Sequence, residues 1–155
     1  MKSFHYSELI ERIKKEIRID FYGIHGIGHW ERVYHNTQLL SEHYGIESKV
    51  FELFALLHDS KRHNEHRDPE HGKRAAEFAA LLMKEGAIEL SDEESGRLLY
   101  ACANHTHHDK SDPLFYDRIV EICFDSDRLD IGRVGIVVDP ERMATGYARA
   151  LAEKL

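Results

Sequence analysis

The chain carries polar residues at positions where a helix would otherwise continue an apolar face. In the stretch LFALLHDSKR, five apolar residues (53–57) run directly into His58 and Asp59. Both side chains are costly to bury unless another group pairs with them. Phe51, Phe54 and His58 are spaced as neighbours on one face of a helix, so His58 is predicted to point into the core.

Other polar residues begin or continue an apolar helix stripe in the same way. They are His29 ahead of Val33 and Leu40, His71 ahead of Ala75 and Phe78, His105 after Leu98 and Cys102, and Asp127 after Val120 and Phe124. Together with His58 and Asp59 they make an inward-facing set of imidazoles and carboxylates. A metal ion inside a helical bundle could satisfy several such groups at once.

A shared metal would have to lie near the end of the helix that carries His58 and Asp59. Adjacent residues on a helix point about 100° apart, so these two converge only at the helix end, and neighbouring helices must supply the other ligands. Imidazole and carboxylate together suit first-row divalent ions. The sequence therefore predicts a bound divalent metal ion, with Mn, Fe, Co, Ni, Mg and Zn as the candidates.

Each of these residues also has a structural explanation when it is taken alone. A single inward histidine is more often a hydrogen-bonded core residue than a ligand, and Asp127 could form an ion pair with Arg128 or Arg133. His107 or His108 could take the place given to His105. A shared site accounts for the whole set better than coincidence does.

The elements that must position these residues are helices. Apolar periodicity predicts one all-α domain over residues 1–155, a bundle of about six helices with the metal site in its core and no convincing strand. The expected helices cover about 7–17, 29–44, 48–62, 69–86, 91–105 and 114–131, followed by a last amphipathic helix from 140 to the C-terminus. Residues 134–138, VGIVV, could form either a short strand or a buried loop.

Helix start signals support these boundaries. Ser48 can cap the third helix, and Ser91 with Glu94 fits a capping box. Asp68-Pro69 and Asp139-Pro140 each combine an N-cap residue with proline at the first helical position.

Composition limits the classes of partner. Hydrophobic residues make up 42% of the chain and charged residues 32%, with no apolar run long enough to cross a membrane and no signal-peptide core. A cytoplasmic protein is therefore expected, with Cys102 and Cys123 as buried, reduced thiols. The net charge of −7 opposes binding to nucleic-acid backbones and anionic membranes, whereas a small anion could still be held by a local basic patch.

The order His29, His58-Asp59 and Asp127 resembles the H…HD…D signature of the HD-domain superfamily of metal-dependent phosphohydrolases, which are all-helical. The segments HGIGHWERV, LFALLHDSKR, DPEHGKRAAEF and DSDRLDIGRVG occur in that order between about residues 26 and 130. They are similar to segments of small, mostly uncharacterised members of the superfamily. The resemblance therefore covers most of the chain.

The resemblance implies roles for the matching positions. His29, His58, Asp59 and Asp127 would hold the principal metal. His71 and His105 resemble the additional histidines of binuclear members, which would allow a second ion. The chain departs from the branch that cleaves cyclic dinucleotides, because it has no GYP-type segment and carries Ser60-Lys61-Arg62 after the HD pair.

The expected activity is hydrolysis of a nucleotide or another small phosphate ester by metal-activated water. Asp59 is the expected catalytic residue, accepting a proton as well as binding metal. Arg32, Lys61 and Arg62 are candidates for holding the substrate phosphate, although they could equally form a solvated face.

Two other functions remain open at this stage. Some members of the superfamily resemble this six-ligand order and use two irons for oxygen-dependent cleavage of carbon bonds. A non-catalytic domain with a structural metal could instead bind a nucleotide or a partner protein. The sequence leaves open the physiological substrate, monoester or diester specificity, the native metal and the oligomeric state, a homo-oligomer included.

Overall fold

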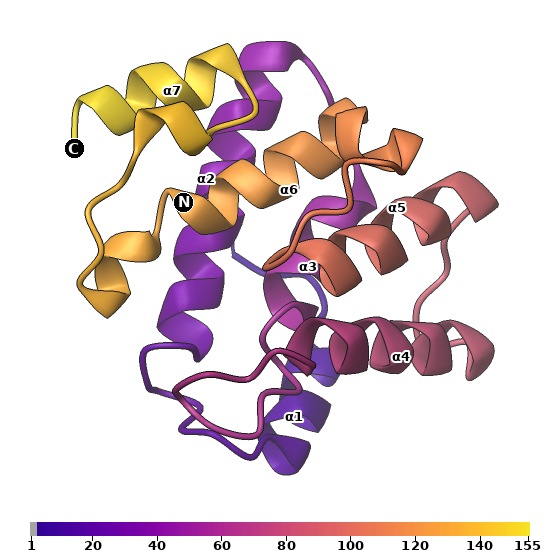
Figure 1. Ribbon diagram of the computed structural model, residues 1–155. Coiled ribbons are helices and arrows are strands. Elements are labelled where there is room, and N and C mark those ends of the chain that lie inside the picture. Colours follow the sequence, from indigo (N-terminus) through magenta and orange to yellow (C-terminus); the bar gives the residue numbers. More distant parts are fainter. Residues whose placement is uncertain (1–2) are drawn as a thin grey trace.

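Helices form the regular structure of residues 3–155, the part of the chain that the computed structural model describes (Figure 1). The α-helices are α1 (Ser7–Glu16), α2 (Ile27–Tyr44), α3 (Lys49–Leu57), α4 (His71–Lys84), α5 (Asp92–Asn104), α6 (Arg118–Arg128) and α7 (Gly146–Glu153). Three short 3₁₀ helices are η1 (Pro113–Tyr116), η2 (Ile131–Val134) and η3 (Pro140–Arg142). No strand occurs within residues 3–155, so the predicted all-α bundle is confirmed.

Helix α3 forms the centre of the bundle. It packs against α2, α4, α5 and α6, and every residue from Val50 to Leu57 is buried. Burial of such an apolar helix on all sides is the main favourable contribution to folding. Because α3 ends inside the bundle, the residues that follow Leu57 emerge among the ends of the neighbouring helices (Figure 1).

Two of the predicted N-terminal caps are confirmed. The Ser48 hydroxyl accepts a hydrogen bond from the backbone N–H of Val50 at 3.1 Å. Ser91 and Glu94 form the reciprocal capping box, with Ser91 Oγ accepting at 3.1 Å and the Glu94 carboxylate at 2.9 Å. These bonds satisfy N–H groups that a helix start otherwise leaves unpaired.

The boundaries around the HD pair differ from the prediction. Helix α3 ends at Leu57 and continues as hydrogen-bonded turns, so the helix predicted to reach Arg62 is shorter. Helix α4 begins at His71 with Glu70 as its N-cap, so the predicted cap at Asp68 is wrong. The Asp68 carboxylate is instead occupied by the backbone N–H of His63 and the guanidinium of Arg74. These contacts, with residues five and six positions away, override the start signal at Asp68.

The C-terminal third is also divided more finely than predicted. The segment predicted as one helix from 114 to 131 is divided among three elements. It overlaps η1, is interrupted at Asp117, which caps α6, and reaches the first residue of η2. Asp139-Pro140 starts η3 and not α7, whose N-cap is Thr145. Residues 135–138 form a loop in which Val137 is 89% exposed, which corrects both alternatives for this segment.

Cys102 and Cys123 are buried free thiols, as predicted. Among residues 3–155, no helix is both long enough and apolar enough to span a lipid bilayer.

Candidate metal centre

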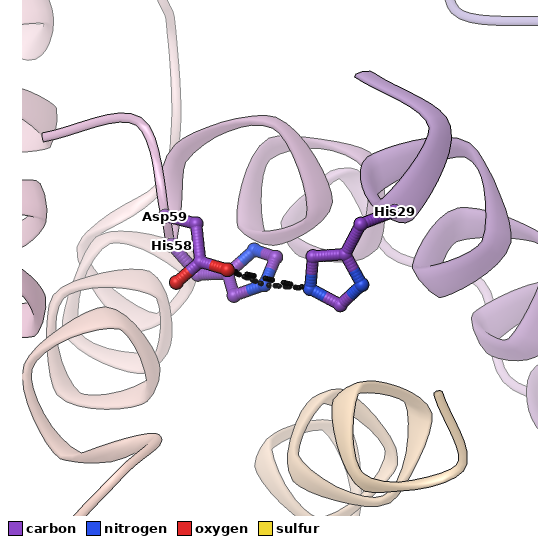
Figure 2. A group of neighbouring side chains, drawn as sticks. All are labelled: His29, His58 and Asp59. Atoms are coloured by element: carbon purple, nitrogen blue, oxygen red, sulfur yellow. Dashed lines mark hydrogen bonds and ion pairs between the residues drawn. The ribbon is translucent and has the colours of Figure 1, made fainter. Parts of the chain in front are cut away.

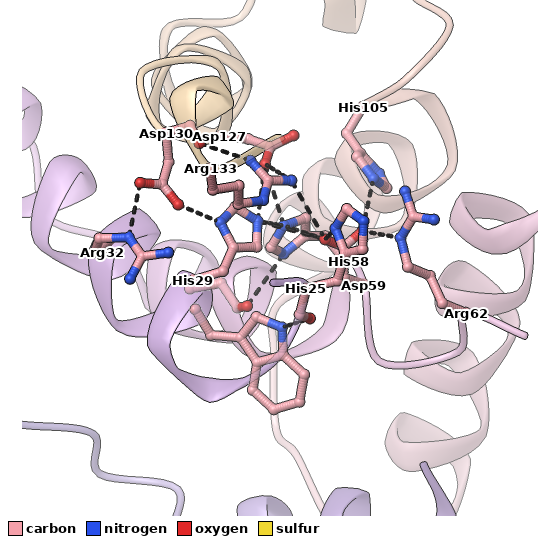
Figure 3. Close-up of polar contacts among 12 residues, drawn as sticks. His25, His29, Arg32, His58, Asp59, Arg62, His105, Asp127, Asp130 and Arg133 are labelled. Atoms are coloured by element: carbon pink, nitrogen blue, oxygen red, sulfur yellow. Dashed lines mark hydrogen bonds and ion pairs between the residues drawn. The ribbon is translucent and has the colours of Figure 1, made fainter. Parts of the chain in front are cut away.

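The structure brings together the predicted metal ligands, and Figure 3 labels all of them except His71. They come from the ends of five helices or from the turns that follow them. They are His29 in the first turn of α2, His58 and Asp59 after α3, His71 at the start of α4, His105 after α5 and Asp127 in the last turn of α6. Side-chain exposure is 3% or less for five of them and 15% for Asp127.

A first group surrounds the pair of imidazoles shown in Figure 2. The Nε2 atoms of His29 and His58 are 3.0 Å apart. Oδ2 of Asp59 lies 3.4 Å from the first of these nitrogens and 3.5 Å from the second. Oδ1 of Asp127 lies 3.2 Å and 3.4 Å from the same two atoms. Two nitrogens and two carboxylate oxygens therefore face one common point.

A second group uses the other oxygen of the same aspartate. Oδ1 of Asp59 lies 3.1 Å from Nε2 of His71 and 3.6 Å from Nε2 of His105. The two imidazole nitrogens are 2.9 Å apart. Two sets of three side chains have a composition and spacing that could hold a metal ion, and Asp59 belongs to both: His29, His58 and Asp59, and Asp59, His71 and His105.

The four imidazoles form outward hydrogen bonds through Nδ1 and turn their Nε2 atoms toward the cluster. Each Nδ1 faces an oxygen that accepts its proton. The acceptors are Asp130 Oδ2 for His29 at 2.7 Å, Phe54 O for His58 at 3.0 Å, Asp68 O for His71, and Cys102 O for His105 at 2.8 Å. A carbonyl oxygen can only accept, so in His58, His71 and His105 Nδ1 carries the proton and Nε2 can present a lone pair. Metal-binding histidines are oriented in the same way.

Several polar atoms in the cluster lack partners within the described part of the chain. Asp59 Oδ2 and Asp127 Oδ1 are buried without a hydrogen bond. The Nε2 atoms of His29 and His58, and those of His71 and His105, also face each other at close range. Burying unpaired acceptors is costly, whereas one cation in each group would satisfy them together. These residues therefore fit divalent ions.

The carboxylates are ionised at neutral pH, as metal ligands must be. Burial raises the pKa of Asp59, but His58 and the other imidazoles around it outweigh burial and hold the pKa well below its usual range. The pKa of Asp127 is lowered in the same way, by His58 and His29 against the effect of burial. Burial lowers the pKa of His29, but the carboxylates of Asp127, Asp130 and Asp59 raise it to about 10, so Nε2 of His29 carries a proton at neutral pH until a metal ion displaces it.

Glycine at position 72 allows α4 to approach α5 closely enough to form the second group. A Cβ atom on Gly72 would lie 2.6 Å from the backbone oxygen of Cys102 and 3.4 Å from Cε1 of His105. The missing side chain therefore helps to set the distance between His71 and His105.

Sequence reasoning did not identify two buried residues beside the cluster as site residues. Nδ1 of His25 lies 3.6 Å from Asp59 Oδ2, and Nη2 of Arg133 lies 3.8 Å from both Asp59 Oδ2 and Asp127 Oδ1 (Figure 3). His25 lies in the glycine-rich loop before α2 and Arg133 in η2, outside any helical stripe. A third neighbour, Asp130, follows Asp127 by about one helical turn, which is the spacing that could have revealed it.

Two of the three cations predicted to hold substrate phosphate lie at or next to the cluster. Arg62 Nε is 3.3 Å from Asp59 Oδ1. Arg32 Nε donates to Asp130 Oδ1 at 2.8 Å, and its side chain is 52% exposed. Lys61 is not brought to the cluster: its ammonium lies 4.2 Å from the centroid of the Phe78 ring, and 4.0 Å from a carboxylate oxygen of Glu16.

Of the three neighbouring histidines considered for the last ligand, the structure brings His105 to the cluster. His107 is exposed, and His108 stacks on Phe124 with ring centroids 4.2 Å apart. The pKa of His108 is lowered to about 4 by burial and by the adjacent Arg128.

Comparisons of the chain with family models, curated proteins and solved structures gave no match.

Proposed function

We propose that the protein is a metal-dependent phosphohydrolase of the HD type that acts on a nucleotide or another small phosphate ester. The observation that supports it best is the position of Asp59, whose two oxygens belong to two adjacent groups of metal-binding side chains. Centres in which two ions share a carboxylate are suited to displacement at phosphorus, since attacking and leaving oxygens can both be stabilised.

The charges around the cluster favour an anionic substrate. The carboxylates of Asp59 and Asp127 face the guanidinium groups of Arg62 and Arg133 at 3.3 to 3.8 Å. These four charges balance, so the charge of any bound cation is left uncompensated in a largely buried site. A phosphoryl group supplies the missing negative charge, whereas a neutral substrate does not.

The roles of the residues follow from their positions. A divalent ion bound here would lower the pKa of a coordinated water and polarise a phosphoryl oxygen. The four imidazoles and Asp127 hold the ions. Asp59 would be a ligand in both groups, and its ionised carboxylate would accept a hydrogen bond from the reacting water. Arg62 stabilises negative charge on the side of the second group.

The test is phosphate release from a panel of nucleotides and sugar phosphates. Metal-stripped protein is resupplied with Mn²⁺, Co²⁺, Ni²⁺, Mg²⁺ or Fe²⁺ in turn. We expect metal-dependent release that is lost in Asp59→Ala and kept in Asp139→Ala, which removes an exposed carboxylate from the η3 cap. Circular dichroism checks that both variants keep their helices.

Absence of release with every metal would contradict the proposal. Oxygen uptake by iron-loaded protein with visible absorption would then favour the di-iron oxygenase. Loss of the helical signal when the metal is removed would instead favour a structural metal.

A further inference from the structure

Arg133 is a buried arginine with unused hydrogen-bond donors. Its side chain is 10% exposed. Within residues 3–155 its guanidinium makes one hydrogen bond, from Nη1 to the backbone oxygen of Asp130 at 3.0 Å. Nε is buried without a partner, and Nη2 is 3.8 Å from the nearest carboxylate oxygens, which is beyond hydrogen-bond distance. Leaving such a donor unpaired is costly for a charged group.

The unpaired atoms around Arg133 are of two opposite kinds. Asp59 Oδ2 and Asp127 Oδ1 are acceptors, which a cation would satisfy. The guanidinium of Arg133 is a donor and already carries positive charge. A cation placed beside it would repel it and leave its donors unpaired. One ligand resolves both problems if it offers anionic oxygens, because one oxygen can approach the cation while another accepts from the guanidinium.

Arg62 is less available for this task than Arg133. Its Nε faces Asp59 Oδ1 at 3.3 Å, and its Nη1 donates to the backbone oxygen of His66 at 3.0 Å. Arg133 lies on the side of the first group, between Asp127 and His29 (Figure 3). The residue that anchors Arg133 also orients a ligand, since the Asp130 carboxylate accepts from His29 Nδ1.

We infer that Arg133 binds an oxygen of the phosphoryl group that is cleaved, an assignment that rests on the proposed function. Asp130 fixes the guanidinium relative to His29, so an oxyanion at the first group meets a preorganised donor. The ligand class is a phosphate monoanion or dianion, and inorganic phosphate, the product, is the simplest probe. Arg133 thus takes the role predicted for Lys61, which lies on Phe78 instead.

The experiment is calorimetric titration of metal-loaded protein with inorganic phosphate. We expect Arg133→Gln to weaken phosphate binding by about ten- to a hundredfold, the effect of losing a hydrogen bond to a charged group. Arg133→Lys keeps the charge without the planar donor pair, so its phosphate affinity should fall between those of the wild type and Arg133→Gln. Arg142→Gln, which removes an exposed guanidinium in η3, should bind phosphate as the wild type does. Metal content, measured in the same samples, should be equal in all four proteins.

Phosphate affinity within twofold of wild type in Arg133→Gln would overturn the assignment, as would loss of metal from that variant or absence of phosphate binding by the metal-loaded wild type. If Arg133→Gln fails to fold, the same measurements are made on Arg133→Lys. Phosphate affinity within twofold of wild type, or loss of metal, would then overturn the assignment. Failure of the proposed function is distinguishable. If the protein binds phosphate through Arg133 but hydrolyses no ester, the role of Arg133 stands and the proposed enzymatic function fails. If the protein hydrolyses esters and Arg133→Gln leaves phosphate binding unchanged, the function stands and the role of Arg133 fails.

Discussion

Asp130 accepts a hydrogen bond from Nδ1 of His29 at 2.7 Å, and the same carboxylate holds Nε of Arg32 at 2.8 Å. The imidazole is therefore held with its Nε2 toward His58 and Asp127. Because a carboxylate partner also makes the imidazole more basic, Asp130 strengthens the ligand that it orients. Arg32 lies outside the cluster and keeps Asp130 ionised. The pKa of Asp130 is lowered, since His29 and Arg32 outweigh the effect of burial.

Removing this carboxylate should weaken metal binding without removing a ligand. In Asp130→Ala we expect affinity for Mn²⁺ or Zn²⁺ to fall by about 10- to 100-fold, the usual effect of losing such a partner. Competition with a chelating dye measures the change, and Asp139→Ala serves as the matched control. Unchanged affinity in Asp130→Ala would mean that packing alone holds His29 in place.

Gly72 provides a test of the second group alone. In Gly72→Ala the new Cβ would lie 2.6 Å from the backbone oxygen of Cys102, so α4 and α5 must move apart. His71 and His105 then separate, while the first group keeps its ligands. We expect the metal content after dialysis to fall from two ions toward one, as measured by elemental analysis.

The matched control for Gly72→Ala is Gly96→Ala, also within a helix (α5), where a Cβ meets nothing within 4 Å. This variant should keep both ions and be no less stable than the wild type, because alanine favours the helix. Two ions bound with wild-type affinity in Gly72→Ala would show that the helices can adapt without loss of the site.

The inward direction of the ligands was predictable because helical periodicity fixes where a side chain points. His29, His71 and Asp127 lie within helices, and His58 and His105 immediately follow helices whose apolar stripes they continue. The capping box at Ser91 was predictable for the same reason, since its contacts are local.

Periodicity carries no information beyond the helix ends. Lys61 follows α3 in a turn and packs on Phe78, and Arg133 reaches the cluster from η2, a single 3₁₀ turn beyond the end of α6. Asp68 shows the same limit, because Arg74 and His63 recruit its carboxylate from outside the expected cap. Contacts between segments decide these orientations, and no local pattern encodes them.

His108 should make stability depend on pH below neutrality. Burial against Phe124 and the nearby Arg128 lower its pKa from 6.5 to about 4, so the unfolded chain binds a proton that the folded protein rejects. The free energy of unfolding should therefore rise with pH between about 4 and 6.5. In His108→Gln this rise should be shallower in urea titrations, whereas exposed His107→Gln should match the wild type. Equal slopes in all three proteins would exclude His108 as the source.

Arg62 and Lys61 adjoin in sequence, yet the structure predicts different kinetic effects for them. Arg62 Nε faces Asp59 at 3.3 Å, so Arg62→Gln removes a cation beside the proposed reaction centre. We expect kcat/KM for a phosphate ester to fall by about tenfold or more, the cost of one charge-assisted hydrogen bond.

Lys61 should behave differently because its ammonium is held over Phe78, next to Glu16, and does not reach the ligands. In Lys61→Gln we expect kcat/KM and KM within twofold of wild type, with at most a small loss of stability from the missing cation–π contact. Steady-state kinetics of the two variants with equal metal loading separates the possibilities. A raised KM in Lys61→Gln alone would place the substrate in the groove lined by Lys61, Arg74 and Phe78, and so on the α4 side of the HD pair.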